Sequence, residues 1–84
     1  MDSKHRNVCG REIIRLRTAR DLSQQQLATK CQLAGWDVSR DIIANIELRR
    51  REVTDEELAI LARVIAAPLE EFYPREIRAR LPKR

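Results

Sequence analysis

Hydrophobic positions recur along this chain with the period of α-helices. In the segment 7–20, Ile13 and Leu16 fall on one side, while Arg11, Arg15 and Arg20 fall mostly on the other. The same inward spacing returns further along, first at Leu27, Ala28 and Cys31 and then at Leu58, Leu61, Val64 and Ile65. No segment alternates with the two-residue period of a half-buried strand. The pattern predicts an all-α domain.

Polar residues mark where these helices begin. Ser23 is followed three residues later by Gln26, and Thr54 is followed in the same way by Glu57. Each pair has the spacing of a capping box, in which side chain and backbone satisfy one another at a helix start. The two pairs predict that the second and fourth helices begin directly after Ser23 and Thr54.

The remaining boundaries rest on single residues. Asn7 is a candidate cap for the first helix, which would end at about Arg20, and Ser39 is a candidate cap for the third. Pro68 precedes a short fifth helix predicted from Leu69 to about Tyr73, and Pro74 would end it. Five helices are therefore expected.

The third predicted helix has two unlike faces. When residues 40–48 are wound at about 100° per residue, Ile42, Ile43 and Ile46 share a side that can pack on a core. The other side carries Arg40, Asp41, Ala44, Asn45 and Leu48. Few of the opposite-charge pairs that support exposed helices occur there. This face is either an ordinary solvated surface or a binding surface.

Length and composition limit the class of protein. Eighty-four residues make one small domain, and 43% hydrophobic with 36% charged residues is typical of a soluble globular chain. No apolar run approaches the roughly 20 residues of a membrane span, and the N-terminus has no secretory signal pattern. Cys9 and Cys31 are then expected to be reduced thiols. We predict a cytoplasmic protein without membrane contact.

Charge is distributed unevenly along the chain. Residues 1–51 include 11 basic and 6 acidic residues. Residues 52–74 include 1 basic and 6 acidic residues, and residues 75–84 include 5 basic residues and 1 acidic residue. The basic front, acidic middle and basic tail indicate one oriented surface for a polyanion. The alternative is that segments of the sequence do not correspond to faces of the molecule.

Residue patterns for catalysis or metal binding are missing from the sequence. It has no Ser/His/Asp arrangement, no catalytic carboxylate pair and no glycine-rich phosphate loop. His5 and Cys9 are spaced i, i+4, but together with Cys31 they fall short of a structural zinc set. We therefore predict no catalytic residues, no metal, no cofactor and no enzyme activity.

Three segments together carry a resemblance to a known family. LSQQQLATKC, VSRDIIANIE and VTDEELAILARVIAAPLEEFY resemble the Cro/C1-type (XRE-like) helix-turn-helix regulators of bacteria and phages, over about residues 7–73. The resemblance implies a compact five-helix, lambda repressor-like domain that binds double-stranded DNA. We assign residues 1–74 to this domain and residues 75–84 to a basic C-terminal tail.

The sequence departs from the family pattern in two places. The link CQLAGWDVS is longer than the usual one, and its turn Gly35-Trp36-Asp37 has no clear role from sequence. Trp36 could stack on the protein's own surface or lie against a sugar–phosphate edge. After Glu47 the family often has Asn-Gly, whereas this chain has Leu48-Arg49.

The resemblance implies that the polar face of the third helix reads bases. Arg40 has the donor fork that suits guanine O6 and N7, and Asn45 suits adenine N6 and N7. Asp41 could accept from a cytosine amine or orient Arg40, and Ala44 leaves room for a thymine methyl. The matching family positions are the usual base readers.

The resemblance also implies backbone contacts and one structural ion pair. Phosphate-binding candidates stand at two helix starts and after the third helix, namely Ser23, Gln24, Ser39, Arg49, Arg50 and Arg51. Ser23 could equally be only a cap, and the arginines could be solvated. Family members commonly pair an arginine and a glutamate matching Arg17 and Glu47, which would lock the third helix at its docking angle.

The expected function is sequence-specific DNA binding, as a repressor-like transcriptional regulator that acts as a homodimer on an inverted-repeat operator. No small-molecule effector is evident. The alternative is a protein-interaction module of the same fold, such as an antitoxin or an antagonist of a regulator. Candidate dimer surfaces are the acidic region of the fourth and fifth helices and the tail residues Ile77 and Leu81; otherwise the tail's Arg80, Lys83 and Arg84 would serve as a basic arm.

Overall fold

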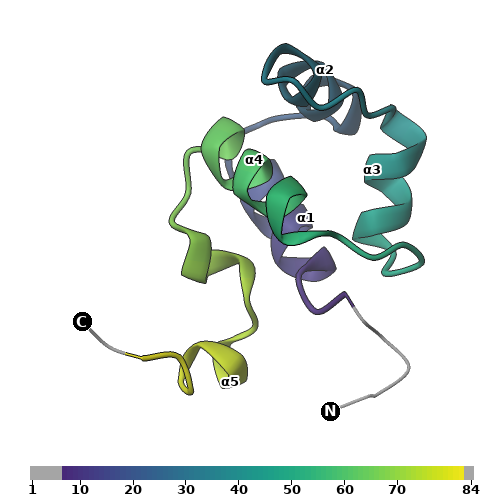
Figure 1. The fold of residues 1–84 in the computed structure, drawn as a ribbon. Coiled ribbons are helices and arrows are strands. Elements are labelled where there is room, and N and C mark those ends of the chain that lie inside the picture. The colour runs from purple at the N-terminus through teal and green to yellow at the C-terminus, as the bar shows by residue number, and fades with distance from the viewer. Residues whose placement is uncertain (1–6, 83–84) are drawn as a thin grey trace.

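The computed structural model describes residues 7–82, and helices account for most of this range (Figure 1). Within it there is no strand, so the all-α prediction is confirmed. Five α-helices and one 3-10 helix follow in the order α1 (Gly10–Ala19), α2 (Gln24–Leu33), α3 (Arg40–Glu47), α4 (Asp55–Ile65), η1 (Leu69–Phe72) and α5 (Arg75–Arg78).

The helices enclose a single hydrophobic core. α2 packs against both α3 and α4, while α1 contacts α3 and η1. Figure 1 places α2 and α5 at opposite ends of the molecule. The largest fully buried side chains come from every helix except α5, and include Ile13, Leu27, Ile43, Ile46, Leu61, Ile65 and Phe72. Burial of these positions agrees with the inward spacing in the sequence, except that Val64 and Ile42 are only half-buried.

Both predicted capping boxes are confirmed. The Ser23 hydroxyl accepts from the Gln26 amide at 3.0 Å, and the Ser23 amide donates to Gln26 Oε1 at 2.8 Å. At the start of α4, Thr54 and Glu57 exchange the equivalent bonds at 3.0 and 3.1 Å. These bonds satisfy backbone donors that a helix start leaves unpaired.

The prediction that Asn7 caps the first helix is wrong. α1 begins at Gly10 after Cys9, and no side chain caps it. Asn7 is buried, and its Nδ2 donates to the Ile46 carbonyl at 2.8 Å and to the Arg51 carbonyl at 3.1 Å. Its Oδ1 accepts from the amide of Cys9, the N-cap residue, at 2.9 Å. The Asn7 side chain therefore joins the chain just before α1 to carbonyls at the end of α3 and in the following turn.

The predicted fifth helix differs in type and is not the last. Leu69–Phe72 is a 3-10 helix, and the chain resumes as the four-residue α5 after Pro74. Tyr73 is extended, with φ −107° and ψ 144°, as a residue before proline prefers, and this breaks the helical path. Arg78 pairs with Glu71, so α5 is held against η1.

Candidate nucleic-acid interface

The inner face of α3 fixes this helix to the rest of the domain. Ile43 and Ile46 are buried, and Ile42 is half-buried. Ser39 is the N-cap, since its hydroxyl accepts from the Ile42 amide at 3.2 Å. An eight-residue helix has little stability alone, so α3 owes its order to this packing.

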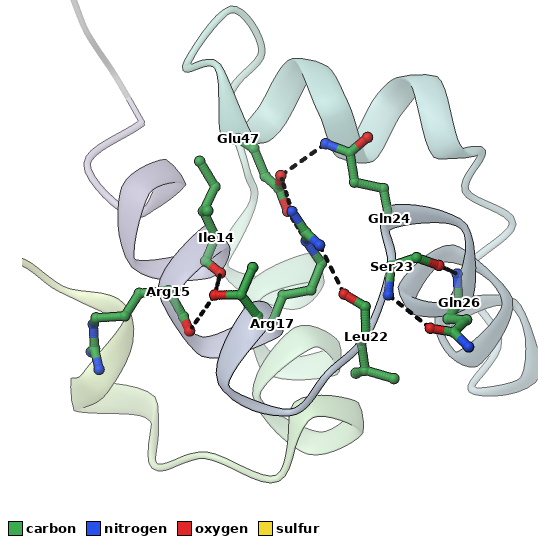
Figure 2. Close-up of polar contacts among 9 residues, drawn as sticks. Ile14, Arg15, Arg17, Leu22, Ser23, Gln24, Gln26 and Glu47 are labelled. Carbon is green, nitrogen blue, oxygen red and sulfur yellow. Dashed lines mark hydrogen bonds and ion pairs between the residues drawn. The ribbon is translucent and has the colours of Figure 1, made fainter.

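Glu47 anchors the end of α3 to two other elements (Figure 2). Its Oε2 accepts from Arg17 Nε at 2.6 Å, and its Oε1 accepts from Arg17 Nη2 at 3.1 Å and from Gln24 Nε2 at 2.9 Å. Arg17 also donates through Nη1 to the Leu22 carbonyl at 2.8 Å. Glu47 is only 4% exposed, so this carboxylate is buried with three donors. The network holds the end of α3, the last turn of α1 and the start of α2 in one arrangement.

The outer face of α3 is open. Arg40, Asp41 and Asn45 are exposed, and Ala44 is half-buried. An ion pair there joins Arg40 Nη1 to Asp41 Oδ1 at 3.4 Å, and both side chains are more than half exposed. Such a pair contributes little stability and leaves most of the guanidinium donors available. The face therefore presents a donor fork, a carboxylate, a small residue and an amide along one helix side.

The two candidates at the start of α2 are already engaged within the protein. The Ser23 hydroxyl accepts within its capping box, which leaves its own hydrogen to donate elsewhere. The Gln24 amide donates to buried Glu47. Sequence reasoning missed this second role of Gln24, because no local spacing links it to a residue 23 positions away.

The side chains of the three arginines after α3 differ in their contacts. Arg49 is half-buried in the left-handed region at φ 63°, and its Nε donates to the Asn7 carbonyl at 3.1 Å. Arg50 is exposed and its side chain has no partner among residues 7–82. Arg51 forks onto both carboxylate oxygens of Glu57 at 3.0 and 2.9 Å. All three were predicted to bind phosphates, but of these three only Arg50 has a guanidinium without a partner among the described residues.

The Arg51–Glu57 contact has an electrostatic consequence. Hydrogen bonds from Arg51 are the main cause that holds the pKa of Glu57 below its usual value, with the Thr54 cap bonds adding to them against the opposing effect of burial. The same contact raises the pKa of Arg51. Arg51 is thus tied to the capping box of α4.

The turn between α2 and α3 is packed on the protein. Trp36 is half-buried against the core, and its amide donates to the Cys31 carbonyl at 2.9 Å. Gly35 has φ +101°, a conformation that L side chains rarely adopt. Gln32 Nε2 donates to the Val38 carbonyl at 2.7 Å and closes the turn. Of the two interpretations of Trp36, this geometry matches packing on the protein's own surface.

Neither a metal cluster nor a membrane span occurs in the part of the chain that the structure describes. No group of three or more His, Cys, Asp or Glu side chains there could hold a metal ion, and His5 lies outside the described residues. Cys9 and Cys31 are buried free thiols whose pKa is raised to about 11, principally by burial. No helix within residues 7–82 has the length and apolar character to cross a membrane.

Comparisons with known proteins agree with this geometry. The helix-turn-helix family model matches residues 13–72, well over half of the chain. The crystal structure of the clp gene regulator ClgR from C. glutamicum is similar with a TM-score of 0.71 and 23% identity, over 89% of this chain and 87% of that chain. The crystal structure of the DNA-binding domain of BldD is similar with a TM-score of 0.71 and 28% identity, over 88% and 100%. A comparison with curated proteins gave no match.

Proposed function

Because this chain belongs to the Cro/C1-type helix-turn-helix family, we propose that it binds double-stranded DNA and regulates transcription by occupying an operator. The observation that carries this proposal is the contrast across α3. Its inner face is fixed by the core and by Glu47, while the side chains of the exposed polar groups on its outer face make only the Arg40–Asp41 contact among residues 7–82. A rigid helix with free donors and acceptors suits readout of base edges in a major groove.

Four residues on α3 are proposed to read bases. Arg40 donates to guanine O6 and N7, and Asn45 pairs with adenine N6 and N7. Asp41 accepts from a cytosine amine or orients Arg40. The distance of 3.4 Å between Arg40 Nη1 and Asp41 Oδ1 supports the second role. Ala44 is small enough for a thymine methyl to approach the helix.

Backbone phosphates are proposed to bind around this helix. Ser39 and Ser23 donate their hydroxyl hydrogens, and Gln24 donates the backbone N–H that stands at the start of α2. Arg50 supplies an unengaged guanidinium, and Arg49 supplies the terminal nitrogens that its bond to Asn7 leaves free. Arg51 contributes only if it leaves Glu57.

The functional unit is proposed to be a homodimer on an inverted repeat, acting as a repressor. One helix of eight residues reaches too few base pairs for a selective site, and two copies related by a two-fold axis double that number. Two exposed leucines are candidates for the dimer contact, Leu69 in the acidic α4–η1 region and Leu81 in the tail. Sedimentation of the protein with and without a selected palindromic duplex tests the dimer, and a single copy on each duplex would refute it.

The DNA-binding proposal is tested by selection from randomised duplexes. The parent protein should enrich one short motif. Arg40→Ala should then cost about 1–3 kcal/mol on that motif and relax the preference at one base position. Arg63→Ala is the matched control, because Arg63 is exposed and belongs to α4 rather than α3. Failure to enrich any motif would contradict sequence-specific binding, and equal losses on selected and random DNA would contradict base readout by Arg40.

A further inference from the structure

A groove lies between α5, the start of α1 and the turn that follows α3. Its volume is about 560 Å³, within the range of small-ligand sites. The charged side chains along it are Arg11, Glu12, Arg49, Arg75, Glu76 and Arg80. We call it the α1–α5 groove. Of the residues that line it, only Arg49 has a role proposed above, as a contact to a DNA phosphate, and none of the base-reading residues lies in it.

Positive charge in the α1–α5 groove exceeds what the protein itself neutralises. Four guanidinium groups face two carboxylates, and the Glu12 carboxylate is already bound by Arg15 at 3.0 Å. Arg11 and Arg75 are exposed, and neither has a side-chain partner among the described residues. Cations gathered without counter-charges repel one another and attract an anion.

Two of these arginines are held in place by backbone carbonyls. Arg49 Nε donates to the Asn7 carbonyl at 3.1 Å, and Arg80 Nε donates to the Glu76 carbonyl at 3.3 Å. These bonds use one nitrogen each, so the terminal nitrogens of both groups remain as donors. Guanidinium forks fixed in this way match the geometry of phosphate oxygens.

The backbone at the start of α1 adds further donors. α2, α3 and α4 each have a capping side chain, whereas α1, ten residues long, has none. Val8, Arg11 and Glu12 line the groove, so the uncapped end of α1 opens on it. Unpaired N–H groups and the helix dipole favour an anion at that place.

We propose that the α1–α5 groove is a phosphate-binding site separate from the α3 face. Arg11, Arg49, Arg75 and Arg80 hold the phosphate oxygens, while Pro74 and Ile77 form an apolar wall. Two sources supply this chemistry, a free polyphosphate compound or the DNA backbone beyond the bases read by α3. Because Arg49 also follows α3 directly, a bound phosphate affects the DNA-binding face; that consequence rests on the proposed function. The site departs from the expectation that no small-molecule effector is evident.

The first arm of the test uses inorganic pyrophosphate and no DNA. Isothermal titration and amide chemical shifts of the full chain should report binding, with the largest shifts at residues 8–12 and 75–80. Arg11→Gln/Arg75→Gln should weaken it by about tenfold or more, since two charge-assisted hydrogen bonds are lost. Lys30→Gln/Arg63→Gln is the charge-matched control, because both residues are exposed on α2 and α4 outside the groove, and it should bind as the parent does.

The second arm measures the salt dependence of binding to duplexes with short and extended flanks. If DNA supplies the phosphate, the groove variant should lower the log–log slope by about 0.9 per lost contact on extended duplexes only. Pyrophosphate binding that depends on the groove arginines, together with salt slopes that the groove variant leaves unchanged, assigns the site to a free compound. Equal pyrophosphate binding by the groove and control variants would overturn the site, as would no pyrophosphate binding together with unchanged salt slopes. The first arm stands even if the protein binds no DNA.

Discussion

On the inner face of α3, Ile43 and Ile46 are buried and Glu47 accepts three hydrogen bonds, whereas Arg40 and Asn45 on the outer face are exposed and nearly free of intramolecular contacts. The two faces belong to one helix of eight residues. Successive side chains of a helix are rotated by about 100° about its axis. One short helix can therefore carry residues that stabilise the fold on one face and residues that recognise a ligand on the other. Substitutions on the inner face should therefore lower stability, while substitutions on the outer face should lower DNA affinity and leave stability unchanged.

The largest effect is expected at Glu47. Glu47→Ala leaves Arg17 without its buried partner, and such a loss costs about 3–5 kcal/mol in fully buried cases. In a domain of this size the melting temperature should fall by more than about 10 °C. Asp41→Ala removes an equally charged but exposed carboxylate and is expected to stay within about 0.5 kcal/mol of the parent. Calorimetry of both variants measures this, and equal melting would break the comparison.

A smaller loss of stability is expected where α1 approaches the end of α3. A Cβ built on Gly10 would lie 2.7 Å from the Ile46 carbonyl oxygen and 3.0 Å from that of Glu47. Backbone atoms cannot move aside cheaply, so Gly10→Ala should destabilise by about 1–3 kcal/mol although alanine favours helices.

Chemical denaturation checks the Gly10 prediction. Thr18→Ala also places alanine on α1, but at an exposed position, and should leave stability almost unchanged. If Gly10→Ala were as stable as the parent, α1 and the end of α3 would have room to separate, and the inner face would be less rigid than its contacts indicate.

On the outer face the expected effect is on DNA alone. Asn45→Ala should lower affinity for the selected site by about 1–3 kcal/mol at one adenine position. Its free energy of unfolding should change by no more than about 0.5 kcal/mol, because the side chain is exposed. Parallel binding and melting measurements test the separation. A matching loss of stability would mean that the outer face also supports the fold.

The smallest effect is expected from pH, at the turn after α3. The pKa of Glu57 is below its usual value of 4.5 because Arg51 donates to the carboxylate. The stabilisation is present above the ordinary pKa and is lost as pH falls through the lowered one. Glu57→Gln should therefore flatten the acid limb of the stability curve. Glu56→Gln, at an exposed neighbouring position, should keep the parent's curve, and identical curves for all three proteins would contradict the assignment.

Local signals predicted the fold well. The capping boxes at Ser23 and Thr54 were readable because donor and acceptor lie three residues apart, and inward positions such as Ile13 and Leu61 followed from the helical period. The type of the 3-10 helix at Leu69–Phe72 was missed, because proline marks a boundary without specifying the hydrogen-bond pattern within it.

Long-range contacts around the candidate site were less predictable. The ion pair between Arg17 and Glu47 was predicted only through the family resemblance, since no local spacing joins residues 30 positions apart. The bond from Gln24 to Glu47 and the fork of Arg51 on Glu57 were not foreseen. Gln24 and Arg51 were both predicted to contact DNA, and in the structure each side chain binds a carboxylate of the protein instead.

Asn7 has a practical consequence for work with this protein. Its side chain joins the chain ahead of α1 to carbonyls 39 and 44 residues later, at the end of α3 and in the turn after it. A protease cut just after residue 7, or a bulky tag joined immediately before it, would withdraw these bonds and loosen the recognition helix without touching it. Fusion partners at this end therefore need a spacer long enough to leave Asn7 seated.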